Sequence, residues 1–132
     1  MEKTVLIIKP DAVRRGLIGH VIGRLERAGF KILEMRLERW NRDDAARFYA
    51  VHRGKSFYEG LLEFMISGPI VPVLLEKENA ISDLRELIGE TDPQAAACGT
   101  IRQEIARDVR QNSVHASDSP ETAVVESEFF FG

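Results

Sequence analysis

Cysteine and long hydrophobic runs are nearly absent from this 132-residue sequence. Cys98 is the only cysteine, which excludes an internal disulfide and a cysteine-based metal cluster. No apolar stretch approaches the roughly 18 residues that a membrane-spanning helix needs. The apolar run Val5–Ile8 ends at Lys9-Pro10-Asp11, which is too early for a secretory signal. We therefore expect a cytoplasmic protein that has no membrane partner.

Positive charge is not in excess either. The chain has 18 Lys and Arg residues against 21 Asp and Glu residues, which gives a net charge of −3. This balance excludes a generally basic surface for nucleic acid, so no nucleic-acid partner is required. Thirteen of the 18 basic residues are arginines, whose planar side chain is well suited to bind phosphate. We expect most of these arginines to be ordinary surface residues.

The composition and length are sufficient to build one folded domain. Hydrophobic residues make up 44% of the chain and charged residues 30%, so the composition supports a core and is not that of a disordered protein. The length is typical of a single domain, and we find no linker, repeat or low-complexity segment. We therefore predict a single domain over residues 1–132.

Local patterns predict strands over residues 4–9, 31–40, 70–75 and 113–117, and helices over 18–28, 41–51, 57–66, 79–88 and 119–131. Pro10 ends the first strand, Asn41 is a helix cap, and Ser119-Pro120 is a strong helix start. Residues 90–110 are polar and interrupted, with only weak helix signals. This order is compatible with an α+β fold, a split βαβ arrangement whose helices cover one face of an antiparallel sheet.

Two motifs suggest familiar chemistry but fail on inspection. Gly54-Lys55-Ser56 resembles the end of a phosphate-binding loop, but the glycine required five positions earlier is Tyr49, and the preceding segment is predicted to be helical. His115, Ser117 and Asp118 suggest a hydrolase triad. In a strand, however, the histidine and the serine share a face while the aspartate points away, and triad residues normally converge from different elements.

A single histidine acting as a nucleophile is a better hypothesis for His115. A neutral imidazole can attack phosphorus if one nitrogen keeps its lone pair while an acceptor holds the proton of the other. Glu126 is a candidate acceptor because it lies among apolar residues of the last predicted helix, where a carboxylate needs a partner. Taken alone, His115 fits a hydrogen-bonded core or surface histidine better than a nucleophile. His20 and His52 have no comparable setting, and we assign them no role.

Phosphoryl transfer also needs positive charge around the migrating group. Lys9 ends an apolar strand, Arg85 flanks the buried stripe of its predicted helix, and Arg102 follows the irregular segment. Each of these residues, taken alone, also fits an ordinary structural or surface role.

Several blocks of sequence, taken together, resemble the nucleoside diphosphate kinase family. The longest block surrounds His115 and is followed in the last predicted helix by Glu121, Glu126 and Phe129-Phe130. The blocks follow the family's order over essentially the whole chain, and the set is far more specific than any one of its members. The blocks are Ile8-Lys9-Pro10-Asp11, Ser67-Gly68-Pro69, Gly89-Glu90-Thr91-Asp92-Pro93, Gly99-Thr100-Ile101-Arg102 and Asn112-Ser113-Val114-His115-Ala116-Ser117-Asp118-Ser119.

This resemblance implies a ferredoxin-like fold and an enzyme. The γ-phosphate of a nucleoside triphosphate, typically ATP, would pass to His115 and then to a nucleoside diphosphate, a ping-pong route through phosphohistidine. Ser117 and Glu126 would orient the histidine, and Tyr49 would support its surroundings. Magnesium would arrive on the nucleotide phosphates. The resemblance also implies a homo-oligomer, usually a tetramer or a hexamer.

The same resemblance assigns the nucleotide contacts. Phosphate oxygens would be held by Arg85, Thr91 and Arg102, while Lys9 and Asn112 would contact the sugar hydroxyls and the phosphate chain. An aromatic face would bind the base with little discrimination among bases. The residues implied around the base are Phe57, Leu61 and Val109. The sequence departs from the family at Val51, where many members carry a carboxylate that could help to hold magnesium's water.

Two other classes of function remain open at this stage. A catalytically inactive ferredoxin-like module that binds nucleotides or serves as a scaffold would keep the fold and lose phosphate-binding residues, but His115, Lys9, Arg85 and Arg102 are all present. An RNA-binding module would need exposed aromatic residues on its strands and a basic face. The predicted strands carry almost no aromatic residue besides Trp40, and the net charge is negative.

Overall fold

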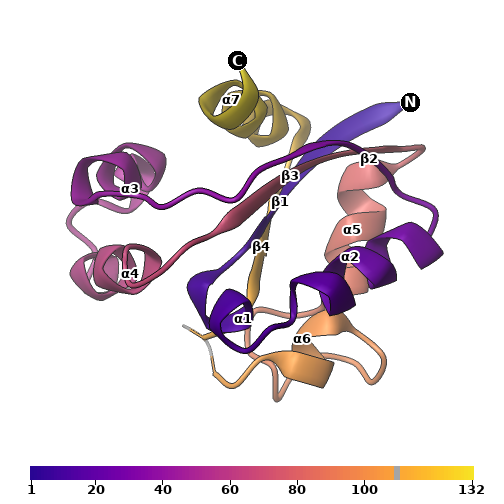
Figure 1. Cartoon of the computed structure of the whole chain (residues 1–132), viewed down its shortest axis with the longest axis horizontal. Coiled ribbons are helices and arrows are strands. Elements are labelled where there is room, and N and C mark those ends of the chain that lie inside the picture. Colours follow the sequence, from indigo (N-terminus) through magenta and orange to yellow (C-terminus); the bar gives the residue numbers. More distant parts are fainter. Residues whose placement is uncertain (109–110) are drawn as a thin grey trace.

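The computed structural model describes residues 1–108 and 111–132, and its centre is a four-stranded antiparallel sheet (Figure 1). The strands are β1 (Glu2–Ile8), β2 (Lys31–Met35), β3 (Val71–Lys77) and β4 (Val114–Ala116). Their order across the sheet is β2-β3-β1-β4, and every neighbouring pair is antiparallel. Strands that are distant in the sequence therefore lie side by side, which confirms the predicted α+β sheet architecture.

The central position of β1 follows from its composition. Val5, Leu6, Ile7 and Ile8 are all fully buried, so this strand is apolar on both faces. It pairs with β3 over its whole length and with β4 at its C-terminal end, where Ile7 lies opposite His115. The end of β1 and the short strand β4 thus bring together two segments separated by about a hundred residues.

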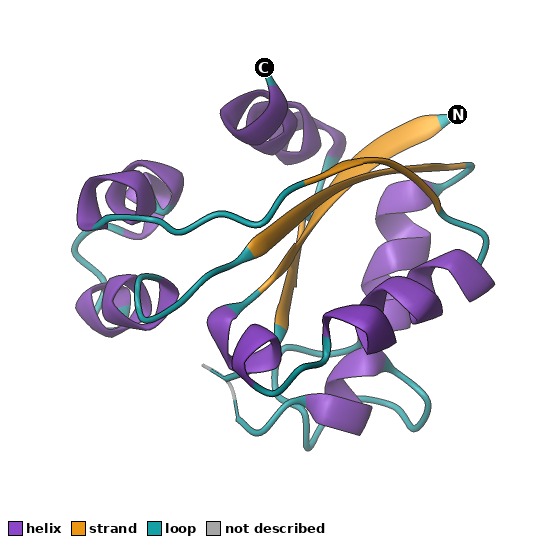
Figure 2. Cartoon of the chain, in the orientation of Figure 1, coloured by secondary structure: helices purple, strands orange, loops and turns teal. Residues whose placement is uncertain are grey.

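Helices cover both faces of the sheet, as Figure 2 shows. One apolar core lies between the sheet and α1 (Pro10–Arg14), α2 (Ile18–Arg27), α5 (Ala80–Ile88) and α6 (Ile101–Ile105). A second core lies between the opposite face and α3 (Arg42–Phe48), α4 (Tyr58–Met65) and α7 (Pro120–Phe131). The expectation of helices on one face is wrong, because side chains on both faces of β1 need an apolar cover.

Several boundaries differ from the sequence predictions. The strand expected over 31–40 ends at Met35, after a register irregularity, and the pairing continues only through a hydrogen bond from Arg36 N–H to Pro72 O and the isolated bridge between Glu38 and Ile70, among the described residues. Pro10 does end β1, but it also starts α1, because proline is well suited to the first position of a helix. α6 forms within the segment expected to be irregular, and Thr100 caps its start. The helix expected over 41–51 consists of α3 and the 3₁₀ helix Ala50–His52.

The predicted helix starts at Asn41 and Ser119 are confirmed. The Asn41 side chain accepts from the backbone N–H of Asp44, and the Asp44 side chain accepts from the backbone N–H of Asn41. Ser119 and Thr122 form the same kind of capping box before α7. The second cap follows β4 almost directly, so it fixes where α7 leaves the sheet. Among the helices that the structure describes, none is long and apolar enough to cross a membrane.

Candidate active site

A cavity of about 490 Å³ opens where the end of β1, β4 and the helices α4, α5 and α6 converge. It collects residues from almost every part of the chain, and most of them are the residues singled out from the sequence. Val109 lies outside the described residues. The cavity is lined by Lys9, Tyr49, His52, Phe57, Leu61, Arg85, Thr91, Arg102, Asn112, His115, Ala116 and Asp118.

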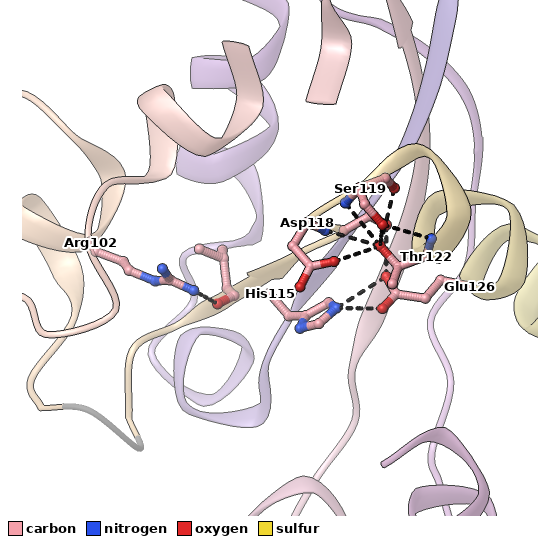
Figure 3. A network of polar contacts seen from close by, with 8 residues as sticks. Arg102, His115, Asp118, Ser119, Thr122 and Glu126 are labelled. Carbon is pink, nitrogen blue, oxygen red and sulfur yellow. Dashed lines mark hydrogen bonds and ion pairs between the residues drawn. The ribbon is translucent and has the colours of Figure 1, made fainter. Parts of the chain in front are cut away.

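His115 lies on β4 with its ring directed toward α7 (Figure 3). Its Nε2 lies 3.1 and 3.0 Å from the two carboxylate oxygens of Glu126, and the Ser117 hydroxyl donates to Glu126 Oε1 over 2.7 Å. Because a carboxylate only accepts, the Nε2 atom of His115 carries the proton. The remaining nitrogen, Nδ1, then keeps its lone pair and can act as a nucleophile. Ser117 and Glu126 lie behind the histidine and do not line the cavity.

Aromatic rings hold the imidazole from the side. The ring centroids of Phe48 and Tyr49 lie 5.4 and 6.4 Å from that of His115, both edge-on. The Tyr49 hydroxyl is buried and has no hydrogen-bond partner among the described residues. Burial and the nearby Glu126 carboxylate raise the pKa of Tyr49, so this side chain stays neutral. Tyr49 therefore supports the histidine without adding charge.

Lys9 lies just beyond the end of β1 and is buried. Its ammonium donates to Asn112 Oδ1 over 3.0 Å, and this bond joins two of the segments that line the charged end of the cavity. Burial and the Arg102 guanidinium lower the pKa of Lys9 to about 8, while Asp11 acts in the opposite direction. Lys9 is therefore still mostly charged at pH 7, although its environment opposes that charge.

Arg102 is buried and is held by backbone carbonyl groups. It donates to Gly89 O over 3.0 Å and to Val114 O over 2.8 Å. Burial and the neighbouring Arg85 lower the pKa of Arg102 to about 10, with Glu90 acting in the opposite direction. Gly89 has a φ of 87°, and a Cβ there would lie 2.6 Å from Thr100 Oγ1. Glycine is therefore required where α5 ends against the start of α6.

Arg85 and Thr91 complete the charged end of the cavity. Arg85 lies in the last turn of α5 and is exposed, and Thr91 follows in the next loop. Within residues 1–108 and 111–132, the Arg85 side chain makes no hydrogen bond or ion pair. Its guanidinium is therefore available to an anion in the cavity, where it would act together with Lys9 and Arg102.

The opposite end of the cavity is aromatic and apolar. Phe57 precedes α4 and is 43% exposed, and Leu61 lies one turn further along the helix. An exposed aromatic face beside an aliphatic side chain suits a flat ring. The ring centroid of His52 lies 5.2 Å from that of Phe57, and its Nδ1 lies 3.2 Å from the Lys55 ammonium.

Sequence reasoning missed two residues of the cavity, His52 and Asp118. His52 lies on the 3₁₀ helix after α3, and no spacing in the sequence indicates that this turn faces His115. Asp118 was considered only as a member of a triad, yet the bend after β4 returns its side chain to the cavity wall. Its position within the block around His115 was the available signal.

A strained turn joins Asn112 to β4. Ser113 has a φ of 73°, and Val114 N–H donates to Asn112 O over 2.9 Å. A central residue with positive φ, whose two neighbours are joined by such a hydrogen bond, characterises the classic γ-turn. This turn is rare and is unfavourable for a residue other than glycine. Such a conformation costs about 1–3 kcal/mol and needs support from its surroundings. Here the Ser113 hydroxyl donates to Asp11 Oδ2 over 2.9 Å.

The comparisons with known proteins agree with this geometry. The family model described as "Nucleoside diphosphate kinase" matches residues 2–132. The nucleoside diphosphate kinase of Chlorobium limicola is 54% identical over 131 residues, which cover 99% of this chain and 94% of that relative. That of Bordetella avium is 50% identical, with 99% and 93% coverage.

Solved structures give the same answer. The Aquifex aeolicus nucleoside diphosphate kinase superposes with a TM-score of 0.97 at 42% identity, over 99% of this chain and 95% of that one. The enzyme of Halobacterium salinarum, solved in complex with CDP, superposes with a TM-score of 0.95 at 39% identity, over 98% and 87%. The chain therefore belongs to the nucleoside diphosphate kinase family.

Proposed function

We propose that this chain moves the γ-phosphate of a nucleoside triphosphate, typically ATP, to a nucleoside diphosphate through a phosphohistidine on His115. The observation that carries this proposal is the pairing of His115 Nε2 with Glu126, which leaves Nδ1 as the nucleophilic nitrogen. Lys9, Arg85 and Arg102 supply positive charge in the same cavity.

Both half-reactions take place at the Nδ1 atom of His115. The Nδ1 lone pair of His115 attacks the γ-phosphorus, the bond from that phosphorus to the bridging oxygen breaks, and the nucleoside diphosphate leaves with the electron pair. The Nε2 proton stays on the ring, where Glu126 stabilises it. A terminal phosphate oxygen of the next nucleoside diphosphate then attacks, the N–P bond breaks, and the histidine returns to its first state.

The remaining cavity residues would bind the nucleotide. Lys9 and Asn112 suit the phosphate chain and the sugar hydroxyls, and Thr91 suits a phosphate oxygen. Arg85 and Arg102 would neutralise charge on the migrating group, where an arginine can contribute about 10³–10⁵ in rate. Around the base we assign Phe57, Leu61 and Val109. Because a stacked base is held by its face, we expect little discrimination among bases.

Magnesium would be bound mainly by the nucleotide. The described residues contain no group of three or more His, Cys, Asp or Glu side chains that could hold a metal ion, and Asp118 is the one carboxylate that lines this part of the cavity. This donor set fits a cation carried on two phosphates, with Asp118 holding one of its waters. When bound, the ion would supply positive charge to the phosphate oxygens.

We also propose that the chain forms a homo-oligomer, a tetramer or a hexamer, and works in the cytoplasm. Exposed apolar side chains at the edge strand support the oligomer, since Met35 is 51% and Leu37 68% exposed. Cys98 is free and exposed, which suits a reducing compartment.

Labelling tests the phosphohistidine directly. Incubation with ATP labelled in its γ-phosphate should give an acid-labile label on the protein, and added GDP should remove it as GTP. His115→Ala should take no label and still bind ADP. His20→Gln is the matched control: this histidine lies on α2 outside the cavity, and a glutamine can keep the hydrogen bond to Glu104, so labelling should be unchanged. Nucleotide binding without any label in the intact protein would instead indicate a catalytically inactive module.

A further inference from the structure

We propose that Asp11, which does not line the cavity, is a positioning residue for its phosphate-binding end. Through the Ser113 hydroxyl it fixes the γ-turn that holds Asn112 against Lys9. This inference rests on the proposed function of the cavity, and it names how that function is supported by a residue outside it.

The tether connects two distant parts of the chain. Asp11 lies in the first turn of α1 and is 2% exposed, and Ser113, immediately before β4, is fully buried. The hydrogen bond from Ser113 Oγ to Asp11 Oδ2 is 2.9 Å long and excluded from water. A buried hydrogen bond to a carboxylate is among the stronger ones in proteins, so it can hold a backbone conformation that serine otherwise avoids.

The turn held by Asp11 determines where two cavity residues meet. The backbone N–H of Lys9 donates to Ser113 O over 2.9 Å, and the Lys9 ammonium donates to Asn112 Oδ1 over 3.0 Å. Both contacts require Ser113 and Asn112 to keep their present backbone course. If the tether were lost, Ser113 would relax toward a negative φ, and the Asn112 side chain would leave the Lys9 ammonium.

The Asp11 carboxylate also has an electrostatic effect on the Lys9 ammonium. Oδ1 is buried and has no hydrogen-bond partner among the residues that the structure describes. An ionised carboxylate in such a place needs compensation from a nearby positive charge. Asp11 is the group that opposes the lowering of the Lys9 pKa, which burial and Arg102 on α6 produce. The remaining charged or titratable groups of the cavity around Lys9 are Arg85, His115, Asp118, Tyr49 and His52.

The first experiment measures the Lys9 ammonium itself, in the free protein. Lys9 is one of five lysines, so its side-chain NMR signal can be assigned with a Lys9→Arg variant. Asp11→Asn keeps the shape and an oxygen for Ser113 but removes the charge. We expect its Lys9 titration midpoint to fall by about 1 pH unit. Asp43→Asn removes the same charge from an exposed site on α3 and should leave the midpoint unchanged. An unchanged midpoint in Asp11→Asn would overturn the electrostatic role.

The second experiment measures ADP binding by calorimetry across pH. In Asp11→Asn the alkaline decline in affinity should begin at lower pH than in the wild type. Ser113→Ala keeps the Asp11 charge and removes only the tether, so ADP affinity should fall several-fold at pH 7. Ser113→Gly should recover much of it, because glycine adopts the positive φ without support. Wild-type affinity in Ser113→Ala would overturn the positioning role, even if Asp11→Asn failed to fold.

These outcomes separate the inference from the proposed function. If the cavity did not serve phosphoryl transfer, the wild type would take no label, while the Lys9 titration would still report on Asp11. If only the inference failed, the wild type would take the label and bind ADP, and the Asp11 and Ser113 variants would behave as the wild type does.

Discussion

At the scale of single residues, the chemistry depends on which nitrogen of His115 carries the proton. The Glu126 carboxylate accepts from both Nε2 of His115 and the Ser117 hydroxyl. A neutral amide at this position has one acceptor oxygen, and its NH₂ would take the place of the other carboxylate oxygen. Because Ser117 would keep the amide oxygen, the amide NH₂ would face His115 and would move the ring proton to Nδ1.

Glu126→Gln should therefore slow labelling of His115 by about 10²–10⁴-fold, while ADP binding stays within a few-fold of the wild type. Removing the competing hydroxyl in Glu126→Gln/Ser117→Ala should recover part of the rate, since the amide can then turn its oxygen toward the histidine. Glu128→Gln on the exposed side of α7 is the control and should label normally. A Glu126→Gln enzyme of wild-type rate would contradict the assigned proton position.

Lys9 also has a consequence for stability. Its pKa is about 8 in the folded protein, against 10.5 in an unfolded chain, so the folded state loses this proton first as pH rises. The unfolded state then binds more protons, and the Lys9 contribution to the free energy of unfolding increases between about pH 8 and pH 10.5, by at most about 1.4 kcal/mol per pH unit. Phosphate binding by the ammonium weakens over the same range.

Denaturant unfolding of the wild type and Lys9→Gln at several pH values tests this sign. The variant should be the more stable protein at pH 7, and the difference between the two should shrink above pH 8. Lys3→Gln, which changes an exposed lysine on β1, should show no such trend. A wild type that lost stability relative to Lys9→Gln as pH rose would refute the argument.

At the scale of elements, α6 depends on contacts outside itself. It has only five residues, too few to form a stable helix alone, yet it carries Arg102. Arg24 on α2 forms an ion pair with Glu104 and donates to Gly99 O over 2.6 Å, while Arg15 donates to Ile105 O over 2.5 Å. The bond to Gly99 holds the start of α6, and the contacts to Glu104 and Ile105 hold its end; neither arginine lines the cavity.

Arg24→Glu and Glu104→Arg should each raise the KM for nucleotides and lower kcat, because Arg102 loses its fixed position. We expect kcat/KM to fall by about 10-fold in each variant. The double exchange Arg24→Glu/Glu104→Arg should restore part of both, since the ion pair can form in reverse. Arg27→Glu changes an exposed arginine on the same helix and is the control. Steady-state transfer between ATP and GDP provides the measurement. Equal losses in the single and double variants would show that the pair does not position α6.

The elements also show where prediction from sequence succeeds. Helices with side-chain caps, such as those after Asn41 and Ser119, were predicted at their starts because the cap is a local signal. α1 was missed because Pro10 was considered only as the end of β1. The second strand was predicted too long because its alternation continues to Trp40, whereas pairing requires a neighbouring strand. Beyond Met35, the described pairing consists of one hydrogen bond to Pro72 of β3 and one bridge to Ile70, just before β3.

At the scale of the whole molecule, the site was predictable in its residues but not in its shape. The blocks around Lys9, Arg102 and His115 predicted site residues because together they resemble the nucleoside diphosphate kinase family, while each residue alone also fits an ordinary role. Their meeting depends on strand order, which brings the end of β1 beside β4. His52 could not be predicted, since its place in the cavity depends on how α3 and α4 pack on the second face of the sheet.

The sheet ends in an apolar edge that bears on assembly. β2 is one of the two outer strands, and Met35 at its end and Leu37 just beyond it are exposed. An outer strand with apolar side chains is a natural place for pairing between copies of a chain. We expect Met35→Glu/Leu37→Glu to reduce the mass measured by light scattering. Val124→Glu, at a 58% exposed position on α7, is the control and should keep the wild-type mass.

Because His115, its partner Glu126 and the cationic residues of the cavity all belong to this chain, the smaller species should still take label from ATP on His115. A wild type that is monomeric at assay concentrations would refute the oligomer. A Met35→Glu/Leu37→Glu protein of unchanged mass would show that the copies meet elsewhere. Loss of labelling in a folded, dissociated variant would show that a second copy is needed to complete the site.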